Sequence, residues 1–182
     1  MENSAKYLKR NDALLLLAKQ LGQKQAFTNE ELLKRLNERI IAWEGGKYCH
    51  MGVNKAGVDC TKLVAMIFIE LGIFSGIDDV FYSSDWFLHT SEEIAINELA
   101  RHCEKYLTNE YKHFVLDYDE KILLPGDVIF FAMLPNKPCH HAAIYCENNK
   151  IFHAINNLGV CFAAWCSAFW GNRARKIIRI VK

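Results

Sequence analysis

The chain has 182 residues and nearly balanced charge, with a formal net charge of +1 at pH 7. Apolar residues make up 51% of it, so a chain of this length can bury a sizeable core, and we expect a single domain over residues 1–182. Near-neutral charge gives no electrostatic reason to expect nucleic acid or a membrane surface as a partner. No segment reaches the length of a transmembrane helix.

The cysteines indicate a reducing compartment. They are odd in number and scattered through apolar segments, which no small disulfide scaffold shows, so we expect mostly reduced thiols. They are Cys49, Cys60, Cys103, Cys139, Cys146, Cys161 and Cys166. The apolar run Ala13–Ala18 is too short for the core of a signal peptide and lacks a small-residue cleavage site. We therefore expect a protein that is cytoplasmic on synthesis, with any export through a phage or a dedicated secretion route.

Two helices are predicted before residue 45. Residues 11–25 alternate Leu and Ala with Lys and Gln, which indicates the first helix. Thr28-Asn29-Glu30-Glu31 has the pattern of a capping box with Thr28 as cap, and predicts a second helix to about Trp43. The glycine-rich stretch Gly45–Gly57 then predicts a loop, and loops leading onto a rigid element often carry functional residues.

The middle of the chain predicts a helical insert at about residues 74–120. Gly72–Thr90 is aromatic and irregular, and Ser91–Leu107 has the pattern of an amphipathic helix with Ser91 as its cap. Such an insert could wall a substrate groove or form a plain peripheral subdomain. We favour the peripheral subdomain.

The last third of the chain changes to strand patterns. Leu124-Pro125-Gly126-Asp127 indicates a turn, and Glu147–Lys150 indicates a hairpin turn between two strands. Five strands are predicted, over residues 128–133, 141–146, 151–155, 160–164 and 177–181. Helices first and strands later predict an α+β domain with an antiparallel sheet.

A cysteine begins the most apolar helix of the chain, in Gly57-Val58-Asp59-Cys60-Thr61-Lys62-Leu63-Val64. Gly57 permits a tight turn and Asp59 is a good helix cap, which places Cys60 at the first helical position. Free backbone N–H groups and the helix dipole favour a thiolate there, so the position suits a nucleophile. A small, unreactive core cysteine would give the same sequence pattern, and only a nearby base would distinguish a nucleophile from it.

Three histidines near the predicted hairpin offer that base. A nucleophilic thiol needs a base within hydrogen-bond reach, and the base needs a partner that orients it. His140 and His141 begin one predicted strand, and His153 lies in the next. A two-residue hairpin loop would pair His153 with Ile144, on the face of His140. A loop one residue longer would pair it with Tyr145, on the face of His141, and the sequence leaves both open.

Four motifs occur in a fixed order, and together they carry a family resemblance. The motifs are Gly57–Val64, Leu124–Phe131, His141–Tyr145 and Ile151–Ala154. They resemble the nucleophile motif, the Pro-Gly-Asp block and the two histidine motifs of NlpC/P60 cysteine peptidases, over roughly residues 41–156. The long insert and the spacing before the cysteine look most like phage-tail and prophage members. The resemblance implies a papain-like fold, in which the cysteine helix packs on the antiparallel sheet.

The resemblance also implies roles for five residues and a reaction. Cys60 would be the nucleophile, His141 the general base and acid, and His153 the group that orients His141. Tyr48 matches a family tyrosine near the oxyanion and substrate, and Asp59, assigned to the same region, is expected to act mainly as a cap. The reaction would be hydrolysis of a peptidoglycan stem-peptide amide, at the D-glutamyl–diamino acid bond, through a thioester. It implies no cofactor.

The sequence departs from the family pattern at two places. Cys49-His50-Met51-Gly52 stands where the family often has Trp-Gly-Gly after the tyrosine, so the substrate-side wall is expected to differ. Ala143 replaces the commoner glycine beside the base.

Other functions stay open beside the peptidase. A cysteine amidase or transferase acting on a non-wall substrate would use the same thiol chemistry. A metal site is a further alternative, although the chain lacks the Cys-x-x-Cys spacing of zinc knuckles. Its ligands would be Cys139, His140, His141, Cys146 and His153. A binding protein with a dead site is disfavoured, because the cysteine and both histidines are present.

Overall fold

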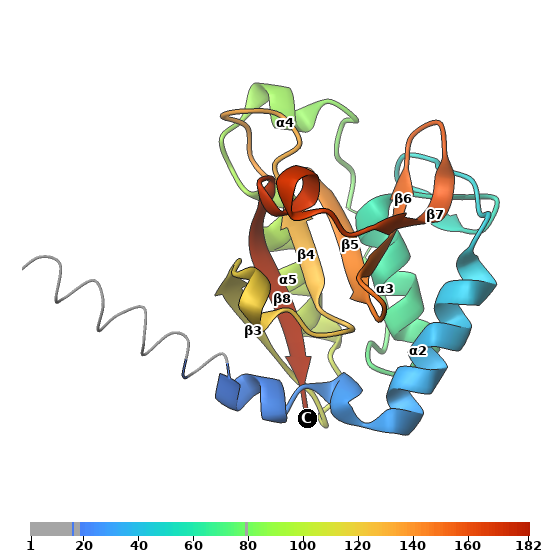
Figure 1. Ribbon diagram of the computed structural model, residues 1–182. Helices are drawn as coiled ribbons and strands as arrows, with labels where there is room; N and C mark the ends of the chain where they lie inside the picture. The colour runs from blue at the N-terminus through green and yellow to red at the C-terminus, as the bar shows by residue number, and fades with distance from the viewer. Residues whose placement is uncertain (1–15, 17–18, 79) are drawn as a thin grey trace, which may run out of the picture.

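The computed structural model describes residues 16, 19–78 and 80–182 (Figure 1). Most of the helix predicted over residues 11–25 lies outside the described residues, and residues 19–23 are helical. In the described part of the chain, no helix is long and apolar enough to cross a membrane.

After the helical residues 19–23, four further α-helices and eight strands follow in the described residues. The helices are α2 (Glu30–Trp43), α3 (Cys60–Glu70), α4 (Trp86–His89) and α5 (Ile94–Tyr106), with short helical turns at Ala26–Thr28, Glu120–Ile122 and Ser167–Gly171. The strands are β1 (Val53–Asn54), β2 (Gly57–Val58), β3 (Lys112–Asp117), β4 (Val128–Phe131), β5 (His141–Cys146), β6 (Lys150–Ile155), β7 (Gly159–Ala164) and β8 (Ala174–Val181).

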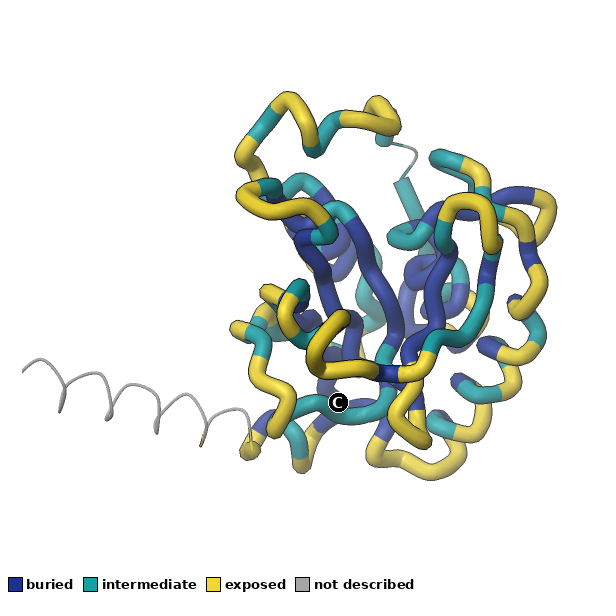
Figure 2. Tube along the Cα trace, turned by 45° about the horizontal axis from the view of Figure 1, so that its top comes forward, coloured by how far each residue is buried: buried dark blue, intermediate teal, exposed yellow. Residues whose placement is uncertain are grey.

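Six of these strands form one antiparallel sheet in the order β3-β8-β4-β5-β6-β7, which confirms the predicted α+β class. Helices α2, α3 and α5 pack on one face, which we call the helical face, and the buried centre of the molecule lies there (Figure 2). A smaller aromatic cluster with Trp165 and Trp170 covers the opposite face, which we call the aromatic face. Successive strand residues alternate between the two, so Phe130 lies on the helical face and Phe131 on the aromatic face.

Two predicted helix caps are wrong. Asn29, not Thr28, caps α2: its Oδ1 accepts from Leu32 N at 2.9 Å, whereas the Thr28 hydroxyl donates to Gln25 O. Helix α5 begins at Ile94, beyond the predicted cap Ser91, and no side chain caps it.

The predicted helical insert over residues 74–120 is not purely helical. Strand β3 lies in it and pairs along its whole length with β8, at one edge of the sheet. Its side chains are half-buried or exposed, so the segment lacks the strong apolar alternation that would have predicted a strand.

The turn before β4 lies where the sequence predicts it, and it packs on the N-terminal segment. Gly126 has a φ of +91°, and a Cβ there would lie 2.0 Å from the ring of Phe27, so only glycine fits. Next to it, the Asp127 carboxylate is fully buried and paired with Arg179 of β8 at 2.6 Å. The Gln25 side chain donates to the same carboxylate at 3.2 Å.

Candidate active site

Cys60 is the first residue of α3, as the sequence predicts. Asp59 caps the helix through a bond from Lys62 N to its Oδ1 at 2.8 Å. The preceding Gly57 is needed for close approach, because a Cβ there would lie 2.4 Å from the Cβ of Cys49. The glycine-rich loop and the short β1–β2 pair therefore hold the start of the helix against the loop that carries Tyr48.

The Asp59 carboxylate is saturated by donors from the chain itself. Besides Lys62 N, it accepts from Thr61 Oγ1 and Met51 N at 3.0 Å, and from the Tyr82 hydroxyl. Asp59 is only 3% exposed. Its position fits the helix cap that the sequence indicates, and its assignment to substrate or oxyanion contact stays a prediction.

His141 and His153 form a buried pair on the aromatic face of the sheet. The Nε2 atom of His141 lies 2.8 Å from Nδ1 of His153. Strands β5 and β6 pair Ile144 with Phe152, and continuing this register places His153 opposite Ala143. His153 therefore shares a face with His141, as the longer-loop alternative required.

Both predicted registers nevertheless name the wrong partner for His153, which lies opposite Ala143 and not opposite Ile144 or Tyr145. The loop contains three residues, 147–149, and the flanking pair is Cys146 with Lys150. Asn148 and Asn149 both adopt positive φ, near +58° and +57°, which asparagine tolerates better than most residues. The loop therefore begins at Glu147, one residue earlier than either alternative assumed.

Trp170 seals the histidine pair from water. Its ring lies nearly parallel to His141 at 6.2 Å and edge-on to His153 at 5.4 Å, and Phe131 adds a third ring against His141. Burial lowers the pKa of His141 to about 3 and that of His153 to about 4. Both imidazoles are therefore neutral at pH 7, so one donates and the other accepts in the bond between them.

The start of β5 lies at the N-terminus of α3. The backbone N–H groups of Ala142, the residue after His141, and of Thr61 and Cys60 face the Cys60 sulfur and act to lower its pKa. These donors favour a thiolate, as the sequence predicts. Burial and the negative charge of Asp59 outweigh them and raise the pKa of Cys60 to about 12. Cys60 is therefore a neutral thiol at pH 7.

A cavity of about 280 Å³ opens beside the thiol. The loop before β1 contributes Tyr48 and His50, the start of α3 contributes Asp59, Cys60 and Thr61, and the strand ends contribute His140 and Asn156. The predicted insert supplies the rest: Tyr82, Ser84, Trp86, Phe87, Ile94, Ala95 and Glu98. The insert thus walls the cavity, and the interpretation as a peripheral subdomain is wrong. Its aromatic composition was the one signal in the sequence.

Tyr48 lies on the wall of this cavity with Cys60, and its role near the oxyanion and substrate stays a prediction. It bridges to Val58 along the backbone, and its ring is half-buried. Burial, and then the charge of Cys60, raise the pKa of Tyr48 to about 12, so its hydroxyl keeps its proton at neutral pH. A protonated hydroxyl here can donate to a substrate oxygen.

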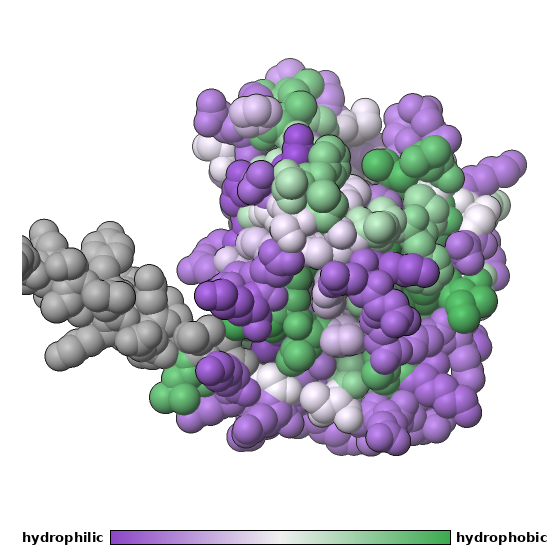
Figure 3. Space-filling view, in the orientation of Figure 1, coloured by the Kyte–Doolittle hydropathy of each residue, from purple (hydrophilic) through white to green (hydrophobic). Residues whose placement is uncertain are grey.

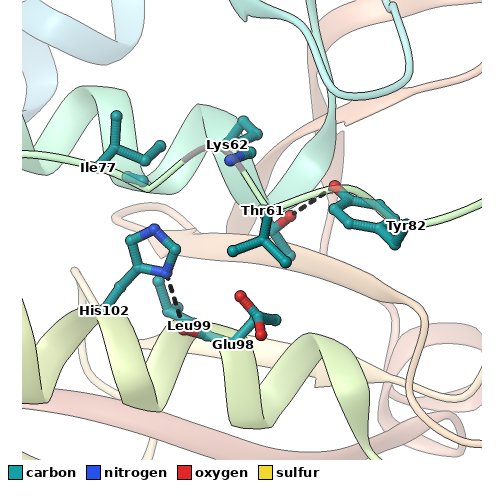
Figure 4. Close-up of a pocket in the computed structure, with 9 residues that line it drawn as sticks. Thr61, Lys62, Ile77, Tyr82, Glu98, Leu99 and His102 are labelled. Atoms are coloured by element: carbon teal, nitrogen blue, oxygen red, sulfur yellow. Dashed lines mark hydrogen bonds between the residues drawn. The ribbon is translucent and has the colours of Figure 1, made fainter.

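A second, smaller cavity adjoins the first between α3 and α5 (Figure 4). The two share Thr61, Tyr82 and Glu98, and the smaller holds about 20 Å³, room for about one water molecule. His102 closes its floor, and its Nδ1 donates to the backbone oxygen of Glu98 at 2.8 Å. The space thus separates the insert helix from the first turn of α3.

The alternative metal site is not assembled. Cys146 points to the helical face, whereas His141 and His153 lie on the aromatic face, because the strand alternation separates them. Among the described residues, no group of three or more His, Cys, Asp or Glu side chains is arranged to hold a metal ion.

Comparison with known proteins identifies the class. The model of the NlpC/P60 family matches residues 45–179, a span that includes the cysteine helix, the insert and every strand of the sheet except the last residues of β8. The chain belongs to the NlpC/P60 family. The phage-type subgroup is a finer statement that this match does not reach.

Particular relatives are distant. The chain is 24% identical over 135 residues to "Probable endopeptidase NlpC" of Escherichia coli, covering 74% of this chain and 70% of that protein. A homologue from Haemophilus influenzae is 24% identical over 139 residues, covering 76% of this chain and 58% of that protein. A Staphylococcus aureus NLP/P60 family structure superimposes with a TM-score of 0.54 at 18% identity, covering 85% of this chain but only 43% of that one. That structural likeness shows the shared fold.

Proposed function

We propose that the chain is a cysteine peptidase that hydrolyses amide bonds of peptidoglycan stem peptides. The observation that carries the proposal is the buried pair of His141 and His153, because Ala142, the residue after His141, lies against the Cys60 sulfur. His140, not His141, lines the cavity beside the thiol, and among the described residues no hydrogen bond joins Cys60 to His141. A neutral imidazole with its second nitrogen bonded to a partner is the arrangement that a thiol nucleophile needs. The NlpC/P60 family and a relative named as a probable endopeptidase support the same reaction.

The proposed mechanism begins with both groups neutral. His153 accepts from Nε2–H of His141. We assign the proton of the Cys60 sulfur to Nδ1 of His141, which the substrate-bound state must bring within reach of the sulfur. The thiolate then attacks the amide carbon, and the backbone N–H of Cys60, with the protonated Tyr48 hydroxyl, stabilises the oxyanion. His141 returns the proton to the leaving amine as the C–N bond breaks, giving a thioester. Water, deprotonated by His141, cleaves the thioester to a carboxylic acid and restores the thiol.

The bond proposed for cleavage is the one between D-glutamate and the diamino acid. A cysteine amidase or transferase with a non-wall substrate would run the same first half-reaction, and would differ in the acyl group or in the acceptor. The composition of the cavity wall is the reason to keep this second candidate, since the insert, which lies outside the four family motifs, supplies half of the lining.

Purified protein incubated with peptidoglycan fragments that carry the stem peptide tests the proposal, with products identified by mass spectrometry. Cys60→Ala is the matched control, because the smaller side chain keeps the helix start and removes the sulfur. A Cys60-dependent cut at the D-glutamyl–diamino acid bond is the expected result. If no fragment is cut while Cys60 still reacts with an alkylating reagent, the wall substrate is wrong and the amidase or transferase replaces it.

A further inference from the structure

Tyr82 is the insert residue that reaches the nucleophile helix. Its hydroxyl lies 3.4 Å from Thr61 Oγ1 (Figure 4) and donates to Asp59 Oδ2. It therefore contacts the residues on both sides of Cys60 in the sequence. His50 holds the other end of Tyr82: its Nε2 donates to the Tyr82 backbone oxygen at 2.7 Å, and the two rings meet edge-on at 4.9 Å. The ring is thus fixed from the helix cap and from the Tyr48 loop.

The Asp59 carboxylate depends on this hydroxyl. Its Oδ1 accepts from Lys62 N and Thr61, whereas Oδ2 accepts only from Met51 N and Tyr82 among the described residues. Bonds to an ionised carboxylate are among the stronger hydrogen bonds in proteins. Without the Tyr82 hydroxyl, half of the donors to Oδ2 are lost, and the carboxylate can turn its charge toward the neighbouring sulfur.

We propose that Tyr82 is a positioning residue for the nucleophile, acting through Asp59. It holds the cap carboxylate away from the sulfur, fixes the first turn of α3 and so makes the insert part of the catalytic machinery. The inference rests on the proposed function only in taking Cys60 as the nucleophile.

Other ionisable groups surround the thiol and stay unchanged when only Tyr82 is altered. They are Tyr48 and His50 of the preceding loop, Asp59 and Lys62 of the helix start, Glu98 of α5, and His140 and His141, backed by His153, of the sheet. The Lys62 ammonium is turned away to the backbone oxygen of Asp78 at 2.6 Å. A change in the reactivity of Cys60 that follows removal of the Tyr82 hydroxyl is therefore attributed to Asp59.

The test is the rate of Cys60 alkylation by iodoacetamide in Tyr82→Phe, measured by mass spectrometry from pH 6 to 9. Phenylalanine keeps the ring and removes the donor. We expect alkylation to be about tenfold slower at each pH, so the variant reaches a given rate about one pH unit above the wild type. The matched control is Tyr106→Phe, another insert tyrosine whose hydroxyl donates to a carboxylate, that of Asp78, but which does not line the Cys60 cavity. It should leave the alkylation profile unchanged.

A double variant separates positioning from a general loss of stability. In the Asp59→Asn background the charge is gone while a good cap residue remains, so Tyr82→Phe should add less than a twofold further change. Thermal melts should place Tyr82→Phe and Tyr106→Phe at similar stability. A wild-type alkylation profile in Tyr82→Phe, an equal loss in Tyr106→Phe, or a full tenfold effect of Tyr82→Phe without Asp59 would each overturn the proposal. Because alkylation needs no peptide, these outcomes are independent of whether peptidoglycan is the substrate.

Discussion

Neutral charge states define the resting chemistry at the level of single residues. The pKa of Cys60 is raised to about 12 and that of His141 is lowered to about 3, each mainly by burial. A thiolate–imidazolium ion pair would need the opposite shifts. In the proposed mechanism, proton transfer from Cys60 to His141 is therefore a step of the reaction rather than a property of the free protein.

The pH dependence of alkylation follows from this state. At pH values well below the pKa of a thiol, the thiolate fraction rises tenfold for each pH unit. We expect the rate of Cys60 alkylation by iodoacetamide to rise steadily from pH 6 to 9 without levelling off. A flat rate between pH 5 and 8 would instead reveal a preformed ion pair.

His153 is expected to act by orienting His141. His153→Ala leaves the Nε2–H of His141 buried without an acceptor, which costs about 1–3 kcal/mol and frees the ring to turn. We expect kcat for peptide hydrolysis to fall about tenfold to a hundredfold. His153→Asn can still accept through its amide oxygen and should retain more activity than the alanine variant. Equal kcat in the wild type and His153→Ala would remove His153 from the mechanism.

The sequence predicts the local part of this site and misses the part that depends on distant packing. Asp59 as cap and Cys60 at the first helical position follow from neighbouring residues alone, and the structure confirms both. The neutral thiol does not follow from the helix start, because the burial that raises its pKa comes from the sheet and the insert. In the same way, Trp170 shields the histidines from a turn outside the four motifs.

At the level of elements, the insert shows where sequence reasoning stops. It joins both halves of the site, since Tyr82 bonds to Asp59, and Cys139 N, two residues before His141, donates to Glu93 at 2.8 Å. Phe87 adds a stacked contact to His140 at 4.0 Å. None of these contacts has a local pattern, so a plain peripheral helix and a substrate wall look alike in the sequence.

Phe87→Ala tests the insert as a substrate wall. The ring lines the cavity and stacks on His140, and a ring contact of this kind is worth about 0.5–1.5 kcal/mol. We expect KM for the cleaved peptide to rise about two- to tenfold, with a smaller change in kcat. Leu88→Ala, on the same short helix and 44% exposed, is the matched control and should leave KM unchanged. The same KM in Phe87→Ala and the wild type would mean that the substrate does not reach this wall.

For the whole molecule, the order of elements is enough to predict the α+β class, and the sheet confirms it. The order of the strands within the sheet, in contrast, does not follow from their order in the sequence. Strand β8 runs between β3 and β4, so the last strand of the chain joins the insert to β4 and β5 (Figure 1). In the same orientation, Figure 3 shows hydrophilic and hydrophobic residues interspersed over this face of the molecule. Such long-range pairing carries no periodic signal, and half-exposed β3 carries little of its own. The buried pair of Asp127 and Arg179 is part of the same long-range organisation.

Asp127→Asn should show that this pair maintains the fold beneath the site. Asp127 and Arg179 are both fully buried and joined by two bonds, from Nε at 2.9 Å and from Nη2 at 2.6 Å. Removing one partner of a buried ion pair typically costs about 3–5 kcal/mol, because the other charge stays out of water. We expect urea unfolding at pH 7 to show a loss of that size. Asp117→Asn removes the β3 partner of an exposed ion pair with Lys176, which lies on β8 like Arg179. This variant should lose less than about 1 kcal/mol of unfolding free energy. Equal losses in the two variants would mean that the buried charges are stabilised by something other than each other.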